Sequence, residues 1–251
     1  FRPSCYYHFL LRNVSYYVEN VEEGIRNYSY CLSKFKNCDP VNYNRTLSNF
    51  IGYLMKHIKN KQANRVLNNK IDEVKSILEF NDQKYLYLNI NYGIYLMLET
   101  NDDPTPYFDS ILFDAGTTET PYIYAKINQA LYIAQHNPIE ALKCLDEIFY
   151  ASICDSNVVP TKIFYKINRL LVDYMNDINN VEFLEEIKST PLRGDEKYTK
   201  YLYSFYSYRF KNKIKYKDLD FKQCFLPGYI FYHGFDAEVL MSSLARPNLR
   251  I

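Results

Sequence analysis

A short phrase recurs along this chain at a spacing close to 40 residues. Lys-Ile-Asn ends at Asn128 and again at Asn168, each time with Leu three positions later, and a looser Ile-Asn version ends at Asn91. The three asparagines are 37 and 40 residues apart. A period of this length is typical of repeats built from a pair of helices. The recurrence therefore predicts an array of helix pairs.

The clearest copy of the unit covers residues 121–150. Its apolar positions recur every three or four residues, which predicts two amphipathic helices joined by a tight His-Asn-Pro corner at 136–138. Similar periodicity predicts further helices at about 21–35, 42–59, 62–80, 83–100, 105–113, 160–174, 181–187 and 195–210.

These patterns and the composition together favour an all-α fold. Only 7 Gly occur, while 27 Tyr and 16 Phe supply long side chains for packing. We expect a right-handed α-solenoid of antiparallel helix pairs over residues 21–210. Residues 1–20 would form an N-terminal cap or the end of a preceding unit. Residues 211–251 would form an irregular aromatic C-terminal cap over the open end of the array.

The unit at 121–150 resembles a degenerate tetratricopeptide repeat. Ala141 matches the small residue of the second helix, Tyr132 the usual aromatic of the first, and Leu145 the following bulky position. The pattern departs at 128–129 and at Ile148, so another helix-hairpin repeat of similar period remains open. The resemblance implies a module that binds proteins or peptides on its concave face.

A second resemblance concerns the N-terminus. The segment from Phe1-Arg2-Pro3 to Phe9-Leu10-Leu11 is similar to the one that closes the helical part of a signal-transducing (STAND-type) nucleotide-binding ATPase before its repeat sensor. The resemblance implies the C-terminal sensor part of such a protein. No Gly-x-x-x-x-Gly-Lys loop is present, so the ATPase would lie outside this chain. Because the chain begins with Phe1 and not Met, we expect a piece of a longer protein or a processed form.

The main functional hypothesis is a protein- or peptide-recognition module, the sensor or scaffold end of a larger multidomain protein. Asparagine amides once per repeat could hold the backbone of a peptide, and tyrosines on the same helices could line a groove. The candidate ligand-binding residues are Asn91, Tyr95, Tyr124, Asn128, Tyr132, Tyr165 and Asn168. The alternatives are that the asparagines bridge adjacent helices and that the tyrosines pack in the core.

A basic run offers an alternative function, a nucleic-acid-binding adaptor. Its members alternate with other residues and are Arg209, Lys211, Lys213, Lys215 and Lys217. They could contact phosphates, or they could form a solvated face. The formal net charge of +1 gives no general attraction to polyanions, which makes nucleic acid the less favoured partner.

No pattern in the chain predicts a catalytic residue, a metal site or a cofactor. The 6 Cys form no Cys-x-x-Cys pair, the 4 His are scattered, and the common nucleophile and glycine-rich motifs are absent. An enzyme without a recognisable motif remains as a further alternative. Reduced cysteines favour a cytoplasmic protein, and the Asn-x-Ser/Thr triplets at Asn13, Asn27 and Asn44 are attributed to chance. No apolar run approaches the length of a membrane span.

Overall fold

The computed structural model describes residues 4–15, 18–80, 85–100, 102–116, 120–148, 165–166, 168–170, 172–173, 175–178 and 182. Within these ranges every regular element is a helix, which confirms the all-α expectation. None of the helices in this part of the chain is both long enough and apolar enough to cross a lipid bilayer. The expected C-terminal cap at 211–251 and the basic run at 209–217 lie outside the described residues.

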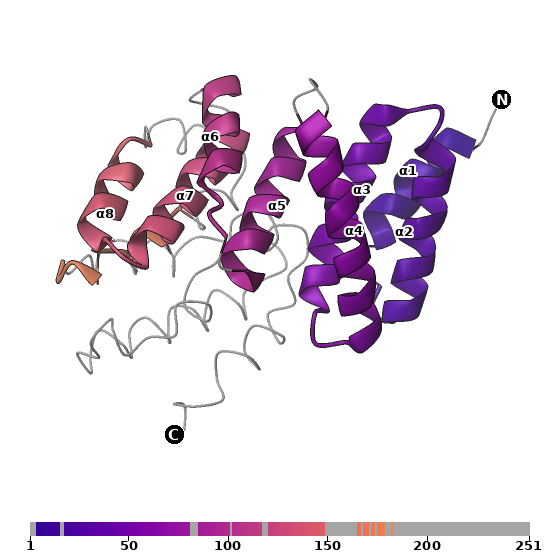
Figure 1. The fold of residues 1–251 in the computed structure, drawn as a ribbon, viewed down its shortest axis with the longest axis horizontal. Coiled ribbons are helices and arrows are strands. Elements are labelled where there is room, and N and C mark those ends of the chain that lie inside the picture. The colour runs from indigo at the N-terminus through magenta and orange to yellow at the C-terminus, as the bar shows by residue number, and fades with distance from the viewer. Residues whose placement is uncertain are drawn as a thin grey trace. The chain divides into compact units, whose positions relative to one another are not determined.

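The chain divides into two compact units, and the division falls between Asp114 and Ala115. The helices of the first unit are α1 (Ser4–Ser15), α2 (Val21–Phe35), α3 (Pro40–Lys56), α4 (Lys61–Phe80), α5 (Leu86–Glu99) and α6 (Thr105–Asp114) (Figure 1). The second unit contains α7 (Thr120–Ala134), α8 (Pro138–Asp146) and shorter described pieces from 165 onward.

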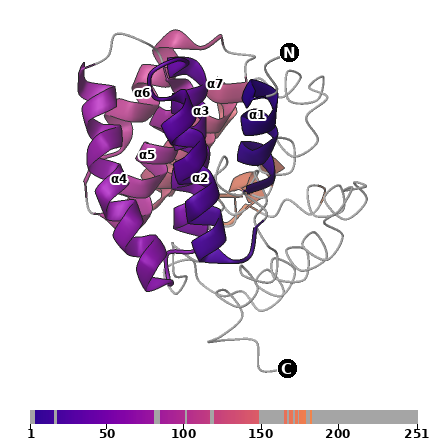
Figure 2. The same cartoon turned by 90° about the vertical axis from the view of Figure 1, so that its right-hand side faces the viewer.

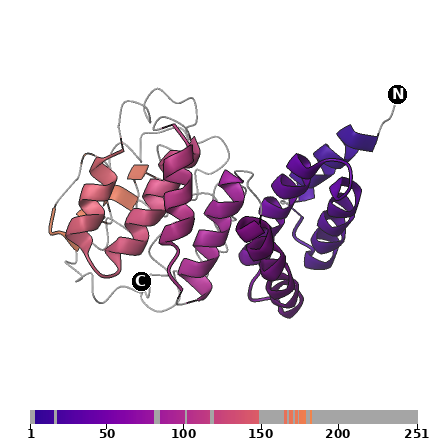
Figure 3. The same cartoon turned by 45° about the horizontal axis from the view of Figure 1, so that its top comes forward.

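Helices of the first unit pack both with their chain neighbours and with the next helix but one. The consecutive pairs from α1·α2 to α5·α6 are in contact, and so are α1·α3, α3·α5 and α2·α4 (Figures 2 and 3). Tyr28 of α2 stacks on Phe50 of α3 with ring centroids 4.9 Å apart, and both side chains are fully buried. The core of the first unit therefore includes the interface between α2 and α3.

Side-chain caps define where several helices begin. Asn20, Asp39 and Asn137 each accept a hydrogen bond from the amide three residues later, at 3.1, 3.0 and 3.2 Å. Pro40 and Pro138 follow two of these caps, where the missing N–H of proline costs nothing. The helix expected at about 42–59 therefore begins at Pro40. Asp39-Pro40 separates α3 from α2 and also caps the start of α3.

Two glycines let helices approach closely in the first unit. A Cβ at Gly24 would lie 2.1 Å from the hydroxyl oxygen of Tyr53, and one at Gly93 would lie 2.6 Å from Cε1 of Phe108. Tyr53 and Phe108 are both 0% exposed. The absence of a side chain at these glycines therefore sets the spacing of α2 from α3 and of α5 from α6.

In the second unit α7 packs against α8, as the pattern at 121–150 predicts. Ala141 and Leu145 of α8 are 0% exposed. An ion pair joins Lys126 of α7 to Glu147 just after α8. Arg169 pairs with Asp146 at the end of α8 and with the buried Asp173. The pair between Arg169 and Asp146 therefore attaches the described residues around 169 to the end of α8.

A candidate ligand pocket between α3 and α5

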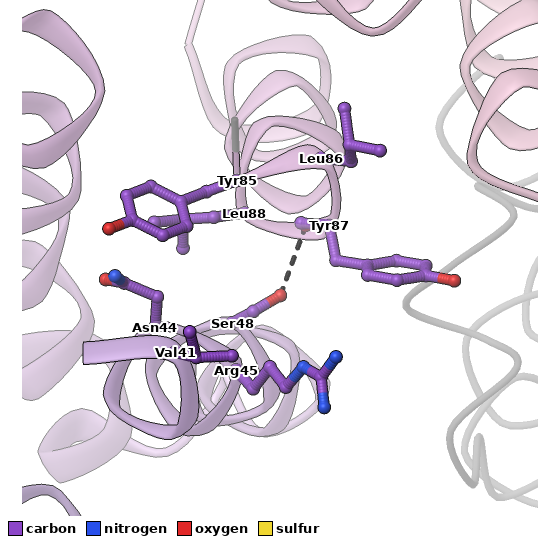
Figure 4. A pocket seen from close by; sticks show the side chains of 8 residues that line it. All are labelled: Val41, Asn44, Arg45, Ser48, Tyr85, Leu86, Tyr87 and Leu88. Carbon is purple, nitrogen blue, oxygen red and sulfur yellow. Dashed lines mark hydrogen bonds between the residues drawn. The ribbon is translucent and has the colours of Figure 1, made fainter. Parts of the chain in front are cut away.

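A pocket of about 450 Å³ opens between the first turns of α3 and α5. It is lined by Val41, Asn44, Arg45, Ser48, Tyr85, Leu86, Tyr87 and Leu88 (Figure 4). Pockets of a few hundred cubic ångströms with apolar walls and a few polar groups are typical ligand sites. All the lining residues belong to the first unit.

The α3 side of the pocket follows from helical spacing. Val41, Asn44, Arg45 and Ser48 stand at positions i, i+3, i+4 and i+7, so they share one face of α3. The start of this face is fixed by the Asp39 cap. Hydrogen bonds from the backbone and side chain of Asn42 hold the pKa of the Asp39 carboxyl below its usual value. Asp39 therefore remains charged and continues to cap α3 well below neutral pH.

The α5 side is formed by the residues at which that helix begins. Tyr85 precedes α5 and provides no side-chain cap for it. The aligned peptide groups of a helix give its N-terminus a partial positive charge, which favours anions and carbonyl oxygens nearby. The start of α5 therefore adds positive potential to an otherwise apolar wall.

Ser48 and Asn91 connect the two sides. The Ser48 hydroxyl donates to the backbone oxygen of Tyr87 at 3.1 Å. Asn91 Nδ2 donates to the backbone oxygen and to the hydroxyl of Ser48, at 2.9 and 3.1 Å. Both residues are 1% exposed. These buried hydrogen bonds fix the separation of α3 and α5 at the base of the pocket.

Asn44 supplies a hydrogen-bond acceptor in the pocket. Its side chain is 6% exposed, and its Nδ2 donates to the backbone oxygen of Pro40 at 3.0 Å. Its Oδ1 is buried and has no hydrogen-bond partner among the described residues. In Figure 4 the amide lies on the same side of the pocket as Tyr85 and Leu88. A buried acceptor left unpaired costs about 1–3 kcal/mol, so a ligand that donates to Oδ1 would recover this energy.

Arg45 supplies positive charge at the edge of the pocket. Its side chain is exposed, and within the described ranges it forms no salt bridge with a carboxylate. Figure 4 shows it on the side of Tyr87, away from Asn44. The pocket thus combines an apolar wall with an acceptor on one side and a cation on the other.

Five of the seven ligand-binding candidates from the sequence are buried within the fold. Asn91 and Tyr124 are 1% exposed, Tyr165 is 4%, and Asn128 and Asn168 are 0%. Asn91 does bridge two helices, which was the structural alternative for this residue. Binding by the other four stays a prediction, and it would require their side chains to become accessible.

Tyr95 and Tyr132 are the half-buried members of the candidate set. Tyr95 packs against Tyr92 with ring centroids 6.2 Å apart, and Tyr132 packs against His136 at 6.3 Å. Tyr95 and Asn91 belong to the first unit, and the other five candidates belong to the second. The seven candidates therefore do not all belong to one unit.

The pocket residues were not predicted from the sequence, although four of them recur at helical spacing along α3. Asn44 stood out only as the start of an Asn-x-Ser/Thr triplet, and Arg45 did not stand out at all. The i, i+3, i+4, i+7 row that begins at Val41 mixes apolar and polar residues, so hydrophobic periodicity does not detect it.

Among the described residues, no three His, Cys, Asp or Glu side chains are grouped in a way that could hold a metal ion. No protein-family model, curated protein or solved structure matches the chain.

Proposed function

We propose that this chain is a protein- or peptide-recognition module of the helix-hairpin repeat type, and that the α3–α5 pocket receives part of a bound segment. The observation that carries the proposal is an apolar pocket that also contains a buried, unpartnered amide oxygen. A polypeptide supplies both an apolar side chain and a backbone N–H from a single residue. After a small movement that makes it accessible, the buried Asn44 Oδ1 would accept the N–H while the side chain lies against Val41 and Leu88.

Helix order and contacts support a tetratricopeptide-like scaffold. If α1, α3, α5 and α7 are the first helices of successive hairpins, they begin at Ser4, Pro40, Leu86 and Thr120, at spacings of 36, 46 and 34 residues. Helix-hairpin repeats have periods of about 34–47 residues. The contacts of α3 with α5, and of α2 with α4, are those expected when hairpins stack side by side. A right-handed solenoid of such hairpins is the architecture we propose.

We also propose a cellular compartment for the protein. Within the described residues, Cys31 and Cys38 are free thiols, and such thiols persist in a reducing compartment. This favours the cytoplasm. A recognition module of this kind would suit the sensor or scaffold end of a larger protein.

A pocket-filling variant tests peptide recognition. Val41 is 53% exposed, so Val41→Trp should fill the pocket without disturbing the core. Ile139→Trp is the matched control, because Ile139 is 64% exposed on α8 in the other unit. The purified full chain and both variants would be used to select from a displayed library of random peptides, and their folding would be compared by circular dichroism.

We expect the unmodified chain and Ile139→Trp to enrich the same peptides. Val41→Trp should lose them while melting at a similar temperature. Failure to enrich any peptide would contradict the proposed function. Equal binding of the enriched peptides to Val41→Trp would show that they bind somewhere other than this pocket.

A further inference from the structure

We propose that the segment bound at the α3–α5 pocket contains an apolar anchor residue with an aspartate or glutamate within two positions of it. This inference rests on the proposed function and specifies the chemistry of the partner. Its evidence is the arrangement of charge around the pocket.

Positive charge at the pocket is not held in a salt bridge within the described residues, although Arg45 interacts through space with Asp39 and helps to lower the pKa of its carboxyl. Arg45 is exposed and makes no salt bridge within the described ranges. The N-terminus of α5 receives no side-chain cap from Tyr85. It contributes the positive end of a helix dipole to the same wall of the pocket. A carboxylate of the partner would meet both charges, whereas a lysine or arginine would be repelled by them.

Asp39, whose carboxyl Arg45 affects through space, is hydrogen-bonded to another residue. Asp39 Oδ1 accepts a hydrogen bond from the backbone amide of Asn42 at 3.0 Å. Asp39 Oδ2 accepts one from the side-chain Nδ2 of Asn42 at 2.7 Å. Asn42 Oδ1 in turn accepts from Arg12 Nη1 at 3.0 Å. Each oxygen of Asp39 thus accepts a hydrogen bond from Asn42, and no salt bridge joins Asp39 to Arg45 among the described residues, so Arg45 keeps donor capacity for a partner carboxylate.

Helix geometry sets the expected spacing between anchor and acid. Consecutive residues on a helix point about 100° apart, so Asn44 and Arg45 diverge and lie on different sides of the pocket (Figure 4). An extended peptide advances about 3.3–3.6 Å per residue. A segment whose N–H reaches Asn44 Oδ1 would thus bring a residue one or two positions away to Arg45.

The volume favours a segment over a single inserted side chain. A pocket of about 450 Å³ exceeds what one aliphatic side chain fills, and it is bounded by apolar atoms of Val41, Leu86 and Leu88. An anchor together with its neighbour would fill it better. We assign the acidic group to the side chain of an internal residue of the segment. The test below distinguishes it from a free C-terminal carboxylate.

The test reverses the charge at the edge of the pocket. The full chain, Arg45→Glu and Arg65→Glu would each be used to select from the same displayed library of random peptides. Arg65 is an exposed arginine on α4 that does not line the pocket, so Arg65→Glu controls for net charge. Arg45→Gln is a second variant that removes the charge without adding a carboxylate close to Asp39.

We expect the unmodified chain and Arg65→Glu to enrich peptides with Asp or Glu within two positions of an apolar residue. Arg45→Glu should enrich Lys or Arg at that place, and Arg45→Gln should show neither bias. A synthetic enriched peptide with an amidated C-terminus should bind Arg45→Glu about tenfold more weakly than the unmodified chain. One mismatched charge pair of about 1.4 kcal/mol has this effect.

The outcomes separate this inference from the proposed function. Enriched peptides without an acidic bias, or unchanged by both Arg45 variants, would overturn the inference and leave peptide recognition standing. Loss of binding on C-terminal amidation would also overturn it, because the acid would then be the chain terminus. Failure to enrich any peptide, or equal binding to Val41→Trp, would overturn both.

Discussion

Asn91 of α5 donates its side-chain amide to Ser48 of α3, to the backbone oxygen at 2.9 Å and to the hydroxyl at 3.1 Å. Both side chains are almost fully buried. The Ser48 hydroxyl in turn donates a hydrogen bond to the backbone oxygen of Tyr87. One residue of the recurring phrase thus joins α5 to α3 through Ser48, which lines the candidate pocket.

Replacing Asn91 with alanine should destabilise the first unit. The change removes two buried hydrogen bonds and leaves space between α3 and α5, for which we expect a loss of about 2 kcal/mol. Urea unfolding followed by circular dichroism would measure it. Asn69→Ala is the control, because Asn69 is exposed on α4 and alanine is the better helix former there. Equal midpoints for the two variants would contradict a structural role for Asn91.

The close approach of Gly24 to Tyr53 gives a second prediction. Gly24→Ala would normally favour a helix by about 1 kcal/mol. Here the new methyl would meet the buried Tyr53 ring, whose hydroxyl donates to the backbone oxygen of Val18 at 3.0 Å and resists displacement. We therefore expect a net loss of about 1–3 kcal/mol in unfolding free energy.

A double-mutant cycle would show whether the clash is the cause. Tyr53→Leu shortens the side chain that the new methyl meets. Gly24→Ala should then cost much less in the Tyr53→Leu background than in the unmodified chain. The same cost in both backgrounds would assign the effect to something other than this contact.

The position of individual helices could be predicted from the sequence because it depends on local signals. Apolar residues at 21, 25, 28, 32 and 35 gave α2 its observed bounds, Val21–Phe35. The start of α3 was set too late because Asp-Pro both ends one helix and caps the next. Residues 1–20 were expected to form an N-terminal cap or the end of a preceding unit, which stays a prediction, and they contain the helix α1 from Ser4 to Ser15.

The candidate site could not be predicted in the same way, because it depends on which helix faces meet. Asn44 and Arg45 are adjacent polar residues in one turn, yet one is 6% exposed and the other is exposed. That difference arises from the packing of α5 on α3, across about 40 residues of chain. The recurrence at Asn91 did indicate an important position, but the sequence alone left open whether its amide served a ligand or a neighbouring helix.

A third prediction concerns the pH dependence of stability. His57 caps the end of α3, its Nε2 is buried without a partner among the described residues, and its ring lies 4.7 Å from that of Tyr53. Burial, with a smaller contribution from Lys56, lowers the pKa of His57 below its usual 6.5. The unfolded chain therefore binds a proton at this site more readily than the folded chain, and stability falls as the pH drops through 6.5.

Urea midpoints measured from pH 7.5 down to 5.5 would check this prediction, since this range lies above the usual pKa of carboxylates. We expect the midpoint to fall on acidification and to fall less for His57→Phe, which keeps a ring against Tyr53 but cannot be protonated. Burial also lowers the pKa of His8, so some dependence should remain in that variant. His136→Phe is the control, because His136 is exposed. An unchanged slope for His57→Phe would show that His57 is not the group responsible.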